Sequence, residues 1–239
     1  MPSKKTKTPR KRPQQARAQE TVHAILEATV QLLERAGPDA ATTTRIAEVA
    51  GVSVGTLYQY FSHRDAIFDA LQEREFERAI ALMQTVLSDD NLAKSPRETV
   101  SGCVQGMLAL YRASPGMHRV LTMEGLRSGK ADRLHSFDLR VISLVRHFLA
   151  ATGAPVRRKN VDAAAFIAFQ CARATMLASL LETPAGVNDQ ALVEELVDLL
   201  LRYLVDDEWL SEHDGATAAR PKAKGKSPAS ATKTRQKNV

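Results

Sequence analysis

The segment from residue 40 to residue 61, AATTTRIAEVAGVSVGTLYQYF, limits what this chain can fold into more than any other stretch. A hydroxyl of Thr42 or Thr43 can cap one short helix, Gly51 ends it, and Ser53 can cap a second short helix over residues 54–60. Helices this short are not stable alone. The apolar periodicity of residues 15–36 predicts a longer helix for them to pack on. The residues expected to lock the pair onto it are Ile46, Val49, Val52 and Leu57.

The small residues of this segment meet the steric requirements of a helix–turn–helix. Close packing of the two helices requires a small residue on the first, which Ala47 supplies. The turn requires a residue that tolerates a positive φ, which Gly51 supplies. In such a motif the second helix presents its N-terminal residues to base edges in the major groove of DNA. The segment therefore predicts a DNA-binding unit.

The residues that we expect to touch DNA lie on these two helices and just outside them. Hydroxyl, phenol and guanidinium donors suit phosphate oxygens, and Gln59 can pair with adenine or with a phosphate. Val54 and the methyl group of Thr56 can touch a thymine methyl, and Gly55 leaves room for close approach. One of Tyr58 and Tyr60 is expected to pack into the core instead. The predicted DNA contacts are Arg17, Thr43, Thr44, Arg45, Ser53, Val54, Gly55, Thr56, Tyr58, Gln59, Tyr60, His63 and Arg64.

Residues 15–70 resemble the N-terminal domain of the tetracycline-repressor (TetR) family of bacterial transcriptional regulators. The segments TTTRIAEVAGVS and GTLYQYF and the pair Arg64-Asp65 match the family pattern nearly position by position. The resemblance implies a helical ligand-binding and dimerisation domain after about residue 71, a homodimer, and a near-palindromic operator in double-stranded DNA. Two positions depart from the family pattern. Val54 stands where many members have lysine, and Ser62 stands where proline is common, so operator sequence and affinity should differ.

The rest of the chain predicts an all-α fold. Apolar residues recur at helical spacing and no window alternates with period two, so we expect about six larger helices behind the N-terminal three-helix helix-turn-helix domain. The expected division is a disordered basic tail (1–13), a helix-turn-helix DNA-binding domain (14–70), a helical effector-binding and dimerisation domain (71–210) and a second disordered basic tail (211–239).

The last two large helices, expected over residues 161–182 and 189–204, are the predicted homodimer interface. The first is rich in alanine, and the second carries more apolar residues than one buried stripe needs. Two such helices from each subunit can form a four-helix interface. The alternative is that this pair packs only within its own chain.

An unknown small-molecule effector is expected to bind between the long helix over residues 65–88 and the helices that follow it. Arg173 lies in an apolar helix and needs a partner, which is either Glu124 of the same chain or a carboxylate on the effector. The same side chains can instead be ordinary core residues. The predicted pocket residues are Met107, Tyr111, Met123, Phe137, Phe148, Phe166, Phe169, Gln170 and Arg173.

The net charge of +6 is unevenly distributed along the chain. Residues 1–13 hold six basic residues and residues 215–239 hold seven, with no acidic residue in either segment. The other 20 basic residues share the chain with all 27 acidic ones, which leaves residues 14–214 with a charge of −7. Tails of this composition are expected to attract DNA phosphates without sequence preference. The alternative is that they only keep the protein in solution.

Several function classes lack their sequence signatures. No nucleophile elbow, P-loop or GxGxxG motif is present, and His118, His135 and His147 do not share a metal-ligand spacing, so we expect no enzyme activity, cofactor or metal site. Cys103 and Cys171 are expected to be free and buried, with a redox switch as the alternative. No run reaches about 18 apolar residues, so we expect a cytoplasmic protein that does not enter a membrane.

These features favour a sequence-specific transcriptional regulator, a repressor released from a palindromic operator by a small-molecule effector. The alternative is a nucleoid-associated or architectural DNA-binding protein that depends on its basic tails. The sequence identifies neither the effector nor the operator nor the regulated genes.

Overall fold

The computed structural model describes residues 11–88, 94–128, 131–182 and 185–213. All secondary-structure elements named within these ranges are helices. This confirms the predicted all-α class, and most helix bounds agree with the sequence to within a few residues. Helix α10 was not predicted, and the two predicted tails lie largely outside the described residues. The elements are α1 (Lys11–Ala36), η1 (Pro38–Ala40), α2 (Thr43–Ala50), α3 (Val54–Tyr60), α4 (Arg64–Val86), α5 (Pro96–Ala113), α6 (Pro115–Ser128), α7 (Ala131–Thr152), α8 (Val161–Leu181), α9 (Asp189–Leu204) and α10 (Asp207–His213).

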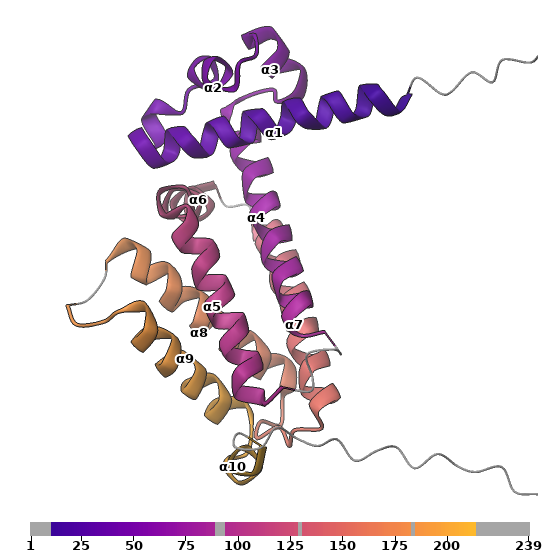
Figure 1. The fold of residues 1–239 in the computed structure, drawn as a ribbon, viewed down its shortest axis with the longest axis vertical. Helices are drawn as coiled ribbons and strands as arrows, with labels where there is room; N and C mark the ends of the chain where they lie inside the picture. The colour runs from indigo at the N-terminus through magenta and orange to yellow at the C-terminus, as the bar shows by residue number, and fades with distance from the viewer. Residues whose placement is uncertain (1–10, 89–93, 129–130, 183–184, 214–239) are drawn as a thin grey trace, which may run out of the picture.

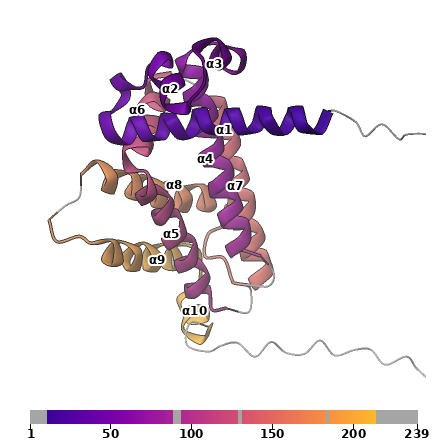
Figure 2. The ribbon, with the colours of Figure 1, turned by 45° about the horizontal axis from the view of Figure 1, so that its top comes forward.

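Helices α1, α2 and α3 fold into a small unit, here called the reader (residues 11–61). Helices α2 and α3 lie side by side across α1 (Figures 1 and 2). Their shared core is built from side chains that are completely buried, among them Ile25, Ile46 and Leu57. Because each of the two short helices contributes such a side chain, the core fixes both of them against α1.

Helix α4 connects the reader to the remaining helices. The N-cap of this helix is His63, whose Nδ1 accepts a hydrogen bond from the Ala66 amide at 3.1 Å. Its first turns place Ile67 and Leu71 in the core of the reader, and its later turns place Ile80 and Met83 in a second core. One continuous helix therefore belongs to both cores, and Figure 1 shows it running from one to the other.

Helices α5 to α10 form a bundle, here called the body (residues 94–213). Helix α5 begins with the capping box that the sequence predicts, because Ser95 Oγ accepts from the Glu98 amide and the Glu98 carboxylate accepts from the Ser95 amide. Helix α9 packs against both α5 and α8. Most apolar residues of α9 are buried within the chain, and Leu199 is the large apolar residue of this helix that is left exposed.

Helix α8 has the length and hydropathy of a membrane-crossing helix, which the count of consecutive apolar residues did not indicate. It packs against α5, α6, α7 and α9 and contributes Ala164, Ala168, Met176 and Leu180 to the core of the body. A single helix of this kind is weak evidence of a membrane segment, because core helices of globular proteins pass the same test.

Helix α6 belongs to the core of the reader although its sequence lies in the range predicted for the second domain. Its Met117 and Leu121 are buried among Ile25, Leu71 and the other apolar residues of that core. In Figure 1 the helix lies directly beneath α1. The reader is therefore completed by a segment more than 50 residues downstream of it, which the predicted boundary at residue 70 did not anticipate.

We expect Met117→Ala to lower the free energy of unfolding by about 2–5 kcal/mol, because it opens a cavity in the core of the reader. Urea unfolding followed by circular dichroism measures this change. Met123→Ala is the matched control on the same helix, because its side chain is half exposed and its loss should cost less than about 0.5 kcal/mol. Equal effects of the two substitutions would contradict the placement of α6.

Candidate DNA-binding surface and candidate effector site

The turn between α2 and α3 has the geometry that the sequence predicts. Gly51 adopts a left-handed conformation with φ of 70°, and its amide donates to carbonyls at the end of α2. Thr42, rather than Thr43, caps α2 by accepting from the Arg45 amide at 3.2 Å. Ser53 caps α3 by accepting from the Thr56 amide at 3.0 Å. These local bonds set the angle at which α3 leaves the turn.

Val49 and the tyrosines of the helix pair differ from the sequence expectation. Val49 was predicted to pack against α1, but it is 39% exposed. Tyr58 and Tyr60 are 50% and 39% exposed, so neither packs into the core, although one of them was expected to do so. Leu57, by contrast, is fully buried as predicted. Both tyrosine rings are therefore on the outer side of α3.

The outer face of the helix pair presents hydrogen-bonding groups that are open to solvent. Thr44, Arg45, Ser53 and Gln59 are exposed, and Thr43, Val54 and Thr56 are half-buried. A side chain added at Gly55 would meet only the Ser53 hydroxyl, at 3.8 Å, so another molecule can approach the backbone closely there. Arg17, on α1, is also exposed.

Two bonds tie polar groups of this face to one another. The hydroxyls of Thr43 on α2 and Tyr58 on α3 lie 3.2 Å apart, which holds the two helices in register. Arg45 donates to the Glu48 carboxylate at 2.7 Å, and both side chains are largely exposed. Such an exposed pair contributes little to stability, so Arg45 can exchange Glu48 for a phosphate at small cost.

Arg64 and His63 have structural partners that the sequence did not reveal. The Arg64 guanidinium donates to the Pro38 carbonyl at 2.8 Å and lies over the Phe68 ring, 4.6 Å from its centroid. His63 caps α4 through Nδ1. Arg64 therefore holds the loop before α2 against α4, and its predicted contact with a DNA phosphate stays a prediction.

The predicted pocket residues separate into two groups. Met107, Tyr111, Phe137 and Phe148 are buried in the core of the body, and Phe169 packs against it. Met123 and Phe166 are 53% and 43% exposed, so neither lies in the interior, because each sits on the outer face of its helix. The aromatic rings meet one another: Phe76 stacks on Phe137 with centroids 4.2 Å apart, and Phe137 meets Phe169 edge-on at 5.7 Å.

Arg173 contacts a side chain that the sequence did not suggest as its partner. Within the described residues its Nε and Nη2 donate to the side-chain oxygen of Gln170, at 3.1 and 2.6 Å, rather than to Glu124. The Gln170 amide in turn donates to Asp138 Oδ2 at 2.7 Å. Burial raises the pKa of the Asp138 carboxyl, and the nearby Arg173 charge opposes that rise.

The burial of two polar side chains of the body, those of Asp138 and His118, was not predicted from the sequence. Asp138 follows Leu134 by four residues and precedes Val141 by three, so its place on the apolar stripe of α7 was visible in the sequence. His118 meets the Tyr111 ring edge-on at 4.9 Å. Burial raises the pKa of Tyr111 to about 12 and lowers that of His118, which keeps both side chains neutral.

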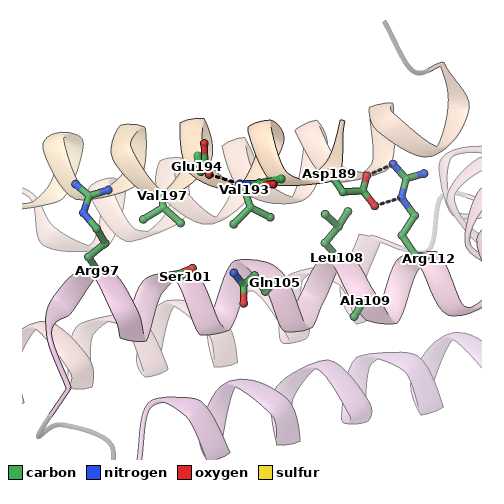
Figure 3. A pocket seen from close by; sticks show the side chains of 11 residues that line it. Arg97, Ser101, Gln105, Leu108, Ala109, Arg112, Asp189, Val193, Glu194 and Val197 are labelled. Atoms are coloured by element: carbon green, nitrogen blue, oxygen red, sulfur yellow. Dashed lines mark hydrogen bonds and ion pairs between the residues drawn. The ribbon is translucent and has the colours of Figure 1, made fainter. Parts of the chain in front are cut away.

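Two open clefts flank helix α9. One, of about 620 Å³, runs between α5 and α9. Figure 3 shows Arg112 at one end of it, where its guanidinium donates two hydrogen bonds to the Asp189 carboxylate. The other, of about 540 Å³, lies between α8 and α9 and is lined by Cys171, Leu192 and Leu199. None of the predicted pocket residues lines either cleft, so neither is the predicted effector site.

Within the described ranges, no group of three or more histidine, cysteine, aspartate or glutamate side chains could hold a metal ion. Both cysteines are free and half-buried, and burial raises the pKa of the Cys103 thiol to about 12. A thiol with this pKa is not ionised at neutral pH and is chemically inert.

An exposed, capped α3 held across α1 by a glycine turn defines a helix-turn-helix DNA-binding regulator, here carried on an all-helical body. Residues 25–71 match the family model described as bacterial regulatory proteins of the tetR family. Residues 95–204 match the model of the tetracyclin repressor-like C-terminal domain. The chain belongs to the tetracycline-repressor family of transcriptional regulators.

Individual proteins similar to this chain share its fold or part of its sequence. It is 34% identical over 107 residues to nucleoid occlusion factor SlmA of Actinobacillus pleuropneumoniae serotype 5b (strain L20), a match that covers 43% of this chain and 50% of that protein. The chain thus spans about half the length of the curated relatives that it matches first.

Solved structures show the same fold at low sequence identity. A TetR-family regulator from Streptomyces coelicolor is 23% identical with a TM-score of 0.58, covering 78% of this chain and 96% of that one. The fatty acid degradation regulator FadR from Bacillus halodurans is 18% identical with a TM-score of 0.59, covering 74% of this chain and 96% of that one.

Substitution of Arg45 and Arg64 should separate a phosphate contact from a structural one. We expect Arg45→Ala to weaken DNA binding and to reduce the slope of log affinity against log salt by about 1, because one phosphate contact is lost. Arg64→Ala should instead lower the free energy of unfolding by about 1–3 kcal/mol and leave that slope unchanged. Fluorescence anisotropy at several salt concentrations and urea unfolding measure the two effects. A smaller salt slope for Arg64→Ala would show that Arg64 touches DNA.

Proposed function

We propose that this protein is a homodimeric repressor that binds a near-palindromic operator and leaves it when a small molecule binds in the body. The observation that carries the proposal is the leading edge of α3, where Ser53 and Gly55 are exposed and Val54 and Thr56 are half-buried. Base reading by this edge would combine apolar contact from Val54 and Thr56 with hydrogen bonds from Gln59. Thr44, Arg45, Tyr60 and Arg17 would hold phosphates on either side.

The dimer would form through the outer faces of α8 and α9. Phe166, Ile167 and Leu181 of α8 and Leu199 of α9 are each between 43% and 49% exposed. Large apolar side chains gathered on one face of a soluble protein favour burial against a partner. Leu199 also lines the cleft between α8 and α9, which could receive a ring of the second copy.

Release of the operator would use helix α4, because it belongs to the cores of both the reader and the body. A ligand that fits one tilt of α4 better than another shifts the population of that tilt. In a dimer, the tilt sets the distance between the two copies of α3, and two half-sites fix the distance that DNA accepts. The ligand and the operator would then oppose each other's binding.

Footprinting on the DNA upstream of the gene for this protein tests the operator. We expect protection of a short near-palindrome, with half-sites about one helical turn apart on one face of the duplex. Protection that spreads evenly over DNA of any sequence at physiological salt would contradict sequence-specific repression.

The dimer predicts that Ile167→Glu yields monomers, because a charge on the apolar face of α8 cannot be buried without a partner. Sedimentation equilibrium measures the mass, and anisotropy should show operator affinity falling at least about 100-fold, because the second half-site is lost. Ala150→Glu is the control, because Ala150 is exposed on α7, and this variant should remain a dimer. A dimeric Ile167→Glu protein would place the interface elsewhere.

A second candidate is an architectural DNA-binding protein. It is favoured by the similarity to SlmA, whose name assigns it to nucleoid occlusion, and by the thirteen basic residues in the two end segments. Deletion of residues 1–13 and 215–239 distinguishes the two functions. A repressor should keep its preference for the operator over random DNA and lose only affinity and part of its salt dependence. An architectural protein should lose nearly all binding.

A further inference from the structure

A row of polar side chains crosses the interior of the body. It begins at His118 on α6, whose ring meets Tyr111 on α5 edge-on. The positive charge of Arg173, on α8, opposes the rise in the pKa of Tyr111 that burial causes. Arg173 donates to Gln170, and Gln170 donates to Asp138 on α7. Four helices thus contribute to a single polar row, and Phe137 and Phe169 pack beside it.

Both ends of this row carry an atom without a hydrogen-bond partner. Among the described residues, three buried side-chain nitrogen or oxygen atoms lack one: Asp138 Oδ1, His118 Nε2 and Arg64 Nε. The first two are the ends of the row, and both residues are more than nine-tenths buried. A buried polar atom without a partner costs about 1–3 kcal/mol, so such atoms usually meet a ligand or a bound water.

Both free atoms accept hydrogen bonds. An ionised carboxylate oxygen can only accept, and Asp138 Oδ2 already accepts from Gln170. His118 Nε2 has no hydrogen-bond partner among the described residues, and it carries the lone pair in the neutral tautomer whose proton is on Nδ1. The nearest carboxylate to Nε2, that of Glu75, lies 3.9 Å away, and its oxygens accept from Arg74 and Arg78. The row therefore offers acceptors where a ligand can supply donors.

Two of the three Arg173 nitrogens, Nε and Nη2, donate to Gln170, and the positive charge of Arg173 also acts on Asp138. An acidic ligand that reached Arg173 would lie close to the Asp138 carboxylate, which repels it. A ligand with an amino group donates to the free Asp138 Oδ1 without displacing Gln170. The aromatic side chains next to the row favour a flat apolar frame on the same ligand and attract a cation on it.

We propose that this row is the recognition element of the effector site and that it takes an aromatic amine, whose N–H groups donate to Asp138 Oδ1 and, in a ligand with a second donor, to His118 Nε2. The assignment rests on the proposed effector site in the body and adds the chemical class of the ligand. Asp138 selects the amino group, and Gln170 and Arg173 are positioning residues that orient the carboxylate.

Two probes with the same ring and opposite charge test the proposal, 2-naphthylmethylamine and 2-naphthoate. Both are titrated into the full-length protein without DNA, and binding is measured by calorimetry and thermal unfolding. We expect the amine to raise the unfolding temperature by about 2–5 °C at ten times its dissociation constant, and the naphthoate to leave it unchanged. Binding of the naphthoate alone, or of neither probe at 10 mM, overturns the proposal.

Asp138→Asn keeps the shape of the side chain and removes its charge, so it should weaken amine binding at least about tenfold. Asp162→Asn is the matched control, because the Asp162 side chain is exposed at the start of α8 and pairs only with Arg146 in the described part of the chain. His118→Phe keeps the ring on Tyr111 and serves as a second variant, with a smaller loss expected for a ligand that has one donor. Unchanged amine affinity in Asp138→Asn overturns the proposal.

The operator is tested separately from the ligand. A protein that binds its palindrome but no amine refutes the ligand class and leaves the repressor intact. A protein that binds the amine at Asp138 and keeps its full operator affinity supports the binding site, but it refutes release of the operator by this ligand. The two results therefore distinguish failure of this inference from failure of the proposed function.

Discussion

The contact between α1 and α6 holds the two halves of this molecule together. The Glu34 carboxylate, at the end of α1, accepts a hydrogen bond from the Met117 amide at 2.6 Å and so caps the first turn of α6. A helix N-terminus has free N–H groups and a partial positive charge, both of which a carboxylate satisfies. Gly116 permits this approach, because a side chain there would come within 3.1 Å of both Glu34 oxygens. Met117 and Leu121 then complete the core of the reader.

This joint makes the reader sensitive to the interior of the body. Met117 lies in the core of the reader, and the next residue, His118, begins the polar row. On the same turn, Arg119 donates to the Leu180 carbonyl near the end of α8. A second link runs through α4, where Arg74 pairs with Glu27 of α1 at 2.6 Å and with Glu75. A shift of α6 or α4 therefore changes contacts in both cores at once, which two independently folded domains could not do.

The parts of the structure that the sequence predicted are those decided by neighbours in the chain. The caps at Ser53 and Ser95 and the left-handed turn at Gly51 depend on bonds that span five residues or fewer, so their patterns are visible in the sequence. Arg64 is the opposite case. A basic residue after the reading helix has the pattern of a phosphate contact, and its actual partner, Pro38, lies 26 residues earlier. The place of α6 could not be predicted for the same reason, because its periodicity shows an apolar face but not which core receives it.

A buried polar row with free ends is costly in a protein that only has to be stable. Apolar side chains of similar volume in place of Asp138, Gln170 and Arg173 would remove the cost of desolvating a charged pair and the cost of the free oxygen. The row is therefore poorly explained as a stabilising feature of the body. It is better explained as a group whose free energy falls when a second molecule supplies the missing donors, because only a ligand with different affinities for two states can shift their populations. In this protein one of the two unsatisfied atoms belongs to His118, which directly follows Met117 of the core of the reader, so a ligand that bound it would act on the joint that holds α1.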